Sequence, residues 1–164
     1  MKTALVDVKT AVAAVRDPEL PFVTIGDLGI LRGVEADGDR ITVTITPTYS
    51  GCPAMDAIRT DVARAAAAAG HPDVRIRTVL SPAWSTDWIT AEGRRKLADA
   101  GVSPPGPARP LASTARPVML AISVRCPRCG SPETTEISRF GPTACTALWR
   151  CRACAEPFEH MKAI

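Results

Sequence analysis

Cys126-Pro-Arg-Cys129 and Cys151-Arg-Ala-Cys154 are two CxxC turns, separated by residues 130–150. A CxxC turn lets two thiolates converge on one ion, and two such turns at hairpin distance supply the four-sulfur tetrahedron that Zn²⁺ favours. The segment between them is rich in strand-forming residues. This stretch therefore predicts a β-rich zinc ribbon whose structural Zn²⁺ is held by the four thiolates.

The predicted ribbon has too few apolar residues to fold unaided, whereas structural zinc contributes about 10–16 kcal/mol in small fingers. One alternative is iron in a rubredoxin-like four-thiolate site that carries an electron. Cys145 lies six residues before Cys151 and is a candidate extra ligand, although a lone extra thiol is more often buried. We expect His160 to be a solvated surface residue, because four cysteines already complete the site.

Bulk composition narrows the class of protein. The chain has 164 residues, 46% hydrophobic and 23% charged, which is typical of soluble globular proteins. A net charge of +3 is too small for a nucleic-acid-binding surface. No apolar run approaches the roughly 18 residues that span a bilayer, and Asp7 and Lys9 interrupt any signal peptide. We expect a cytoplasmic protein without membrane contact, in which clustered cysteines bind metal rather than form disulfides.

A proline-rich stretch divides the sequence. Residues 104–117 contain five of the chain's 15 prolines and have no helical or strand periodicity. Proline fixes φ and removes backbone donors, so such a stretch favours an extended, semi-stiff linker. The sequence predicts a first domain over residues 1–103, a linker over 104–117 and the four-cysteine ribbon over 118–164.

The first domain shows the periodicities of a small α+β fold. An apolar stripe at helical spacing ends before Pro18, and alternating residues flank Asp37-Gly38-Asp39 as in a β-hairpin. The predicted elements are a helix ending before Pro18, strands over 30–35 and 40–46, a helix from Pro53 to Gly70, a strand around 74–76 and a helix over 88–100. The order α-β-β-α-β-α predicts a small mixed sheet covered by helices.

Two features of this domain could carry chemistry, Asp17-Pro18-Glu19 and the lone Cys52. If Pro53 is the first helical residue, Cys52 is the N-cap, where the helix dipole and unpaired amides favour its thiolate. A thiolate beside two carboxylates would make a mixed-ligand metal site. The alternative is a polar turn at Asp17 and Glu19 with Cys52 as a small buried residue, and the residue types leave both open.

Longer motifs resemble a known family. The first domain contains D-P-E-L at 17–20, T-P-T-Y-S-G-C-P at 46–53 and S-P-A-W-S-T-D-W-I-T-A-E-G-R-R-K-L at 81–97. Together these stretches resemble the SufT-like (MIP-type) family of iron–sulfur assembly factors. The ribbon contains C-P-R-C-G-S at 126–131 and C-T-A-L-W-R-C-R-A-C-A-E-P-F at 145–158. This addition resembles the PaaD branch of that family, which belongs to phenylacetate degradation.

The resemblance implies an accessory or maturation component of the 1,2-phenylacetyl-CoA epoxidase system rather than an enzyme. It implies that Cys52 handles iron or an iron–sulfur cluster transiently, with Asp17 and Glu19 lining the same pocket, and that the partners are epoxidase subunits. The sequence agrees, because it lacks the Glu-x-x-His pairs of a di-iron bundle and any dinucleotide-binding glycine-rich turn.

The alternatives to a maturation factor are an electron-carrying ribbon and a thiol enzyme that uses Cys52. The sequence contains only two histidines, His71 and His160, and both lie far from Cys52 along the chain, so a thiol enzyme would lack an obvious base. A homodimer that shares a cluster also remains open.

Overall fold

The computed structural model describes residues 2–38, 40–49, 51–106 and 124–162. The chain divides into two compact units, Met1–Lys96 and Leu97–Ile164. The predicted α+β class is confirmed, because three helices and two sheets are present. From residue 107 onward the predicted linker lies outside the described residues. No helix in the described part of the chain is long and apolar enough to cross a membrane.

The first unit follows the predicted order of elements. Its elements are α1 (Lys2–Ala13), β1 (Leu31–Asp37), β2 (Arg40–Ile45), α2 (Met55–Ala68), β3 (Arg75–Thr78), the 3₁₀ helix η1 (Thr86–Trp88) and the start of α3 (Ala91–Asp99). Strands β1 and β2 form the predicted antiparallel hairpin around Gly38. Strand β3 then pairs in parallel with β2, giving the sheet order β1-β2-β3.

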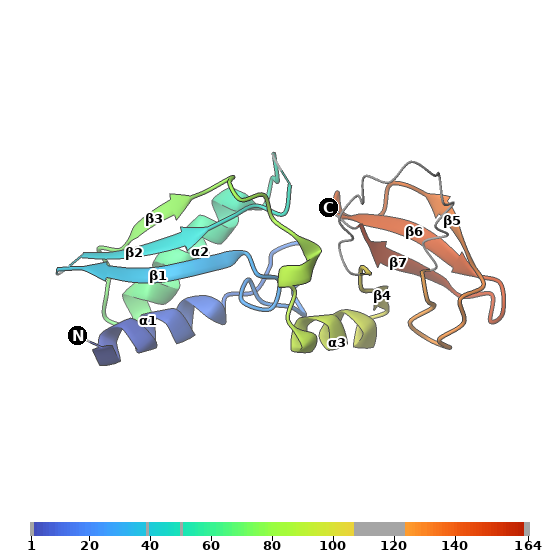
Figure 1. The fold of residues 1–164 in the computed structure, drawn as a ribbon, viewed down its shortest axis with the longest axis horizontal. Coiled ribbons are helices and arrows are strands. Elements are labelled where there is room, and N and C mark those ends of the chain that lie inside the picture. Colours follow the sequence, from blue (N-terminus) through green and yellow to red (C-terminus); the bar gives the residue numbers. More distant parts are fainter. Residues whose placement is uncertain (1, 39, 50, 107–123, 163–164) are drawn as a thin grey trace, which may run out of the picture. The chain divides into compact units, whose positions relative to one another are not determined.

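The core of this unit lies between the sheet and helices α1 and α2 (Figure 1). Strand β2 alternates isoleucine or valine with threonine, so one of its faces is apolar. The largest fully buried side chains from these elements are Val8, Val12, Val43, Ile45, Ile58 and Val62. Because β2 and β3 are parallel, their carboxyl ends meet at one edge, and the loop over residues 46–54 starts there and leads into α2.

Two predicted helix starts are wrong. Helix α2 begins at Met55 with Ala54 as its N-cap, so Cys52 is not the cap. Ahead of α2, the Cys52 N–H instead donates to the Tyr49 carbonyl at 3.3 Å, and the Met55 N–H donates to the Cys52 carbonyl at 3.4 Å. The last helix begins at Ala91 rather than at residue 88, because residues 86–88 form the 3₁₀ turn.

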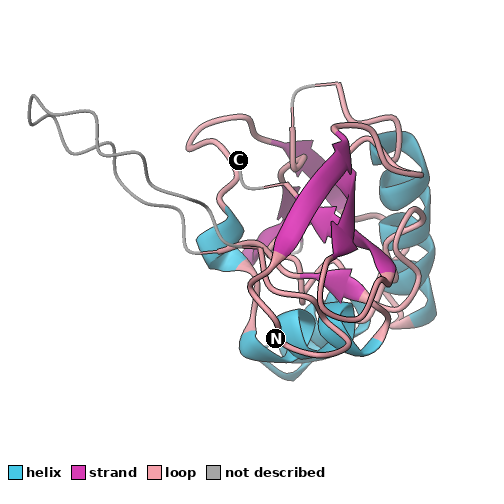
Figure 2. Cartoon of the chain, turned by 90° about the vertical axis from the view of Figure 1, so that its right-hand side faces the viewer, coloured by secondary structure: helices cyan, strands magenta, loops and turns pink. Residues whose placement is uncertain are grey.

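The second unit contains a four-stranded sheet, and its strands are among those coloured magenta in Figure 2. Its strands are β4 (Val102–Ser103), β5 (Thr134–Ser138), β6 (Thr146–Cys151) and β7 (Pro157–Met161), in the order β4-β7-β6-β5. Strands β5 and β6 come from the strand-forming segment between the two CxxC turns, whereas β4 and β7 were not predicted. Strand β4 lies within the predicted first domain yet pairs in parallel with β7. The predicted limits of the first domain, the linker and the ribbon stay a prediction.

His160 corrects a prediction about the ribbon. We expected it to be solvated, but it is only 8% exposed. Its Nδ1 lies 3.1 Å from the Ser103 carbonyl oxygen, and its ring packs edge-on against Trp149. Burial lowers the pKa of His160 below its usual value. This residue therefore fastens β4 to β7 as a neutral imidazole.

Candidate metal centre and the Cys52 loop

The two CxxC turns bring four sulfur atoms together. The Sγ atoms of Cys126, Cys129, Cys151 and Cys154 all lie within 4.8 Å of one another. The distance from Cys126 Sγ to Cys154 Sγ is 3.8 Å, and that from Cys129 Sγ to Cys151 Sγ is 3.6 Å. A tetrahedron with metal–sulfur bonds of about 2.3 Å has edges of about 3.8 Å. The arrangement therefore fits one tetrahedral metal ion, and the spacing is too long for a disulfide.

Backbone amides lower the pKa of one thiol in this cluster, while burial and hydrogen bonds between the thiols raise the pKa of two others. The N–H groups of Cys154 and Ala153 point at the Cys151 sulfur and lower the pKa of that thiol to about 7. The Ser131 N–H lowers the pKa of Cys129, but the hydrogen bonds with Cys151, Cys154 and Cys126 and burial together outweigh it and raise that pKa to about 12. The thiols thus share protons that a metal ion would displace.

Both turns use the same backbone conformation after their second cysteine. Gly130, which follows Cys129, has φ of +74°, and Ala155, which follows Cys154, has φ of +63°. This left-handed region costs little for glycine and more for alanine. Ala155 is the single non-glycine residue with positive φ in the described part of the chain. The second turn therefore accepts backbone strain to place its cysteines.

A small apolar cluster backs one side of the four sulfur atoms. Val124, Cys126, Cys151 and Phe158 are buried together, and Trp149 packs against them. Cys129 and Cys154, by contrast, are exposed. The site is therefore anchored on one side by packing and reaches solvent on the other, and its stability must depend mainly on the ion.

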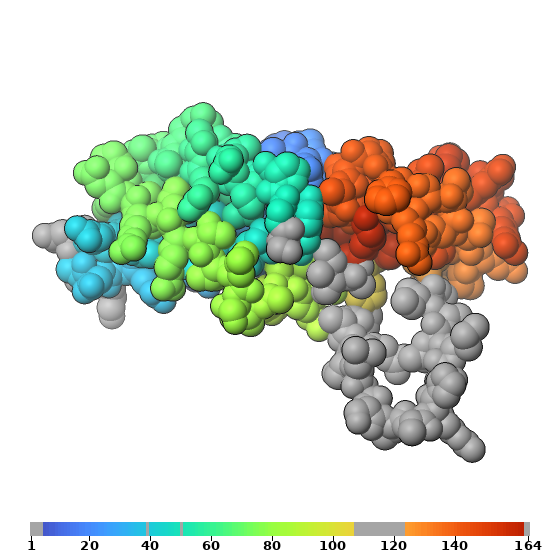
Figure 3. Space-filling model, turned by 90° about the horizontal axis from the view of Figure 1, so that it is seen from above, coloured from blue at the N-terminus to red at the C-terminus, as the bar shows by residue number. Residues whose placement is uncertain are grey.

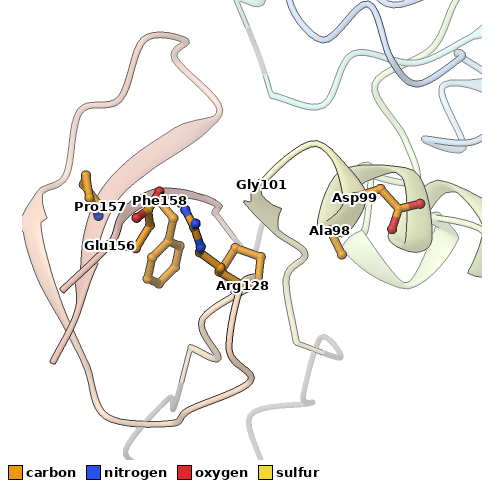
Figure 4. A pocket seen from close by; sticks show the side chains of 8 residues that line it. Ala98, Asp99, Gly101, Arg128, Glu156, Pro157 and Phe158 are labelled. Carbon is orange, nitrogen blue, oxygen red and sulfur yellow. Dashed lines mark hydrogen bonds and ion pairs between the residues drawn. The ribbon is translucent and has the colours of Figure 1, made fainter. Parts of the chain in front are cut away.

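An ion pair joins the two turns on the surface. Arg128 lies between the cysteines of the first turn, and its Nη1 is 2.8 Å from Oε1 of Glu156, which follows the second turn. These two residues, together with Phe158 and the end of α3, line a pocket of about 290 Å³ (Figure 4). The bridge between Arg128 and Glu156 was not predicted, because nothing in the spacing of the two residues signals it.

Cys145 does not join the four-cysteine group. It is buried, and its sulfur lies 3.1 Å from the Thr143 hydroxyl oxygen. Its carbonyl oxygen accepts a hydrogen bond from the Lys162 N–H, just before β6 and just after β7. The structure thus places Cys145 as a packed side chain, which is the plainer of the two alternatives.

Asp17 closes the turn between α1 and the following loop. Its Oδ1 accepts hydrogen bonds from the N–H groups of Glu19 and Leu20, both at 2.9 Å. The side chain is only 7% exposed, and burial raises its pKa above the usual value despite those two amides. Glu19 is less buried, and its pKa is also raised, first by burial and then by the charge of Asp17. The first role of the Asp17 carboxylate is therefore to accept hydrogen bonds that hold the backbone of its own turn.

Cys52 lies close enough to Asp17 and Glu19 for their negative charges to affect the pKa of its thiol. Burial raises the pKa of its thiol, and the negative charges of Glu19 and Asp17 raise it further. The Ala54 N–H and the Thr48 side chain hydrogen-bond to the sulfur and oppose this effect. Thr48 lies in the same loop and was not singled out from the sequence. The predicted stabilisation of the thiolate by the helix terminus is wrong, because desolvation outweighs the amide.

Gly51 fixes the shape of this loop. It has φ of +98°, and a Cβ added there would meet no atom within 4 Å, so conformation rather than space requires glycine. Cys52 is half-buried, in contrast to the exposed Cys129 and Cys154. Among the described residues, Cys52, Asp17 and Glu19 do not form a compact ligand set like that of the four cysteines.

Two family models give the class of protein to which this fold and the four-cysteine cluster correspond. Residues 5–78 match the model described as "Iron-sulfur cluster assembly protein". Residues 112–162 match the model described as "PaaD zinc beta ribbon domain".

Curated relatives and one solved structure agree with this class. The chain is 45% identical over 148 residues to a "Putative 1,2-phenylacetyl-CoA epoxidase" subunit of Escherichia coli, covering 90% of this chain and 86% of that protein. It is 34% identical over 93 residues to the "Fe-S protein maturation auxiliary factor" of Porphyromonas gingivalis, covering 56% and 88%. The crystal structure of a DUF59 domain from Bacillus anthracis superposes with a TM-score of 0.54 at 27% identity, covering 58% and 92%.

The chain belongs to the PaaD family. The identity to the Escherichia coli protein spans both units, whereas the Porphyromonas gingivalis and Bacillus anthracis proteins correspond to little more than half of the chain. The family resemblance inferred from the motifs is therefore confirmed.

Proposed function

We propose that this protein is a non-catalytic maturation factor for a 1,2-phenylacetyl-CoA epoxidase system. In this proposal Cys52 transiently holds iron or an iron–sulfur cluster for a client subunit, while the ribbon holds a structural Zn²⁺ and docks on the client. Two names support it, since one relative is named as an epoxidase subunit and another as an iron–sulfur maturation factor.

The observation that carries the proposal is the contrast between the two thiol environments. Four sulfur atoms in tetrahedral array make a closed site, which suits a permanent ion. Cys52 is a single half-buried thiol whose nearest charges are carboxylates, and burial with those charges raises its pKa. A ligand that must lose a proton to bind, and that supplies only one sulfur, gives an ion up readily.

The same environment disfavours the thiol-enzyme alternative. A catalytic cysteine needs its thiolate stabilised, and its pKa is then lowered by cationic neighbours or a helix terminus. The pKa of Cys52 is raised instead, and α2 starts three residues later. Cys52 is thus better suited to accept a soft metal ion, which replaces its proton, than to attack a substrate.

The test is Cys52→Ser, co-expressed with the epoxidase subunits of the same organism. We expect the variant to fold and retain its zinc, while the iron content of the client subunit falls severalfold, measured by elemental analysis of the purified subunits. Cys145→Ser is the matched control, because it removes a thiol that lies outside the four-cysteine group. Full iron loading of every subunit with Cys52→Ser would refute the role of Cys52.

A further inference from the structure

We propose that Phe140, with Ile137 and Arg139, forms a preorganised docking site on the ribbon for the client protein. The partner surface that fits it is an apolar recess bordered by carboxylates. This inference rests on the proposed function, because a delivery factor must dock on its client, and it adds the site and the chemistry of that contact.

The first observation is the exposure of the apolar side chains. Phe140 is 81% exposed and Ile137 is 53% exposed, on the ribbon that forms the orange-to-red surface of Figure 3. The chain has only seven aromatic residues, and others, such as Trp84 and Phe158, are buried. Aromatic side chains dominate the binding energy of protein interfaces. Among the phenylalanines of the described residues Phe140 is the most exposed, and in an aromatic-poor protein this favours a contact with a partner.

The second observation is that the backbone around Phe140 is held in place. The Ser138 hydroxyl donates to the Phe140 carbonyl at 2.9 Å and accepts from the Phe140 N–H at 3.0 Å. Lys162 Nζ donates to the Arg139 carbonyl at 3.1 Å, and the Gly141 N–H donates to the Thr146 carbonyl at 3.0 Å. A loop fixed before binding loses little entropy in the complex. The backbone that carries the Phe140 ring is therefore fixed before binding.

The third observation concerns the strand that precedes this loop. Strand β5 is the outer strand of the sheet, but its pairing with β6 is irregular between Glu136 and Ser138. Such a bulge interrupts the ladder and discourages the addition of a partner strand. At the same position it sets Ile137 outside the regular pairing. Recognition on this surface must therefore go through side chains.

Charge selects the kind of partner. The Arg139 side chain is 88% exposed, and Lys162 Nζ lies 5.8 Å from the centre of the Phe140 ring. One carboxylate, Glu136, lies 3.8 Å from Arg139, so the two cations outnumber the acid. Arginine beside an aromatic ring is the composition enriched in interface hot spots. Carboxylates on the partner would complement these cations and speed association.

The test uses the zinc-loaded full chain and each epoxidase subunit of the same organism, purified separately as the probes. Titration calorimetry should find one subunit that binds the wild-type protein. Phe140→Ala should weaken that binding at least tenfold, and Arg139→Glu should weaken it severalfold and reduce its salt dependence. Phe22→Ala is the matched control, because Phe22 is a 37% exposed phenylalanine in the first unit, and it should bind like the wild type.

Several outcomes would overturn the docking site. These are binding by Phe140→Ala with wild-type affinity, an equal loss of affinity in Phe22→Ala, or no binding of the wild type to any subunit. Zinc content and circular dichroism verify that Phe140→Ala is folded. The proposed function can fail separately from the docking site. Cys52→Ser should bind the client with wild-type affinity whether or not Cys52 carries iron, so its iron-delivery result bears only on the role of Cys52.

Discussion

The four-cysteine ribbon and the Cys52 loop place the same chemical group in opposite surroundings. In the ribbon, each sulfur has three others within 4.8 Å, and backbone amides lower the pKa of Cys151 to about 7. In the loop, burial and two carboxylates raise the pKa of Cys52. One site gathers four sulfur atoms around the position of one ion, while the other offers a single sulfur and favours the neutral thiol.

Under the proposed function, this difference explains how one chain would combine a permanent metal site with a temporary one. Metal affinity depends on how many deprotonated ligands converge, because each proton displaced costs free energy. In the ribbon four ligands converge, because the distances between the sulfur atoms match those around a tetrahedral ion. The Cys52 loop does not meet it within the described residues, so a ligand from cargo or client would have to complete the site.

The largest expected effect comes from breaking the ribbon cluster. Cys151→Ser should abolish the binding of one zinc per chain and unfold β5, β6 and β7, because structural zinc supplies about 10 kcal/mol or more. The amide signals of β1 to β3 in a two-dimensional NMR spectrum should keep their positions, since the first unit has its own core. Cys145→Ser serves as control and should keep both the zinc and the strands. Strands that persist in zinc-free Cys151→Ser would show that packing alone holds the ribbon.

A smaller effect is expected at Asp17, whose titration should make the stability of the first unit depend on pH. Its folded-state pKa is raised above 3.8, so the folded state takes up a proton before the unfolded state does. The stability of the first unit should therefore rise as pH falls from neutral through the folded pKa towards 3.8, and be lower where the carboxylate is charged. Asp17→Asn keeps an oxygen for the Glu19 and Leu20 amides and should remove this pH dependence.

Asp17→Ala supplies the comparison, because it removes that oxygen and should lower the free energy of unfolding by about 1 kcal/mol at neutral pH. Urea unfolding of the three proteins between pH 4 and 7 measures both effects. An Asp17→Asn protein that keeps the wild-type pH dependence would assign the titration to another group.

Sequence reasoning succeeded where covalent spacing or strong periodicity dictates structure. The CxxC spacing was sufficient to predict the cluster, and the alternation along 40–46 was sufficient to predict β2. It failed at β4, because two residues carry no periodic signal and become a strand only by pairing with β7. It also failed at His160, whose burial depends on that same pairing.

The Cys52 loop shows a second limit of sequence reasoning. Proline at 53 suits a helix start, yet residues 53 and 54 form a turn and α2 begins only at Met55. The sign of the pKa shift then follows from desolvation, which no local motif reveals. The sequence could bring Asp17, Glu19 and Cys52 to attention, but it could not show that Asp17 uses Oδ1 to close its own turn.

The most direct test of the contrast is the metal content of wild-type protein and Cys52→Ser after anaerobic incubation with ferrous iron and sulfide, followed by a mild chelator. Both proteins should keep one zinc per chain through the chelator step. Of the two proteins, only the wild type should carry iron before the chelator step, and it should lose that iron to the chelator. Equal iron in the two proteins, or zinc that leaves as readily as iron, would contradict the division into a holding site and a releasing site.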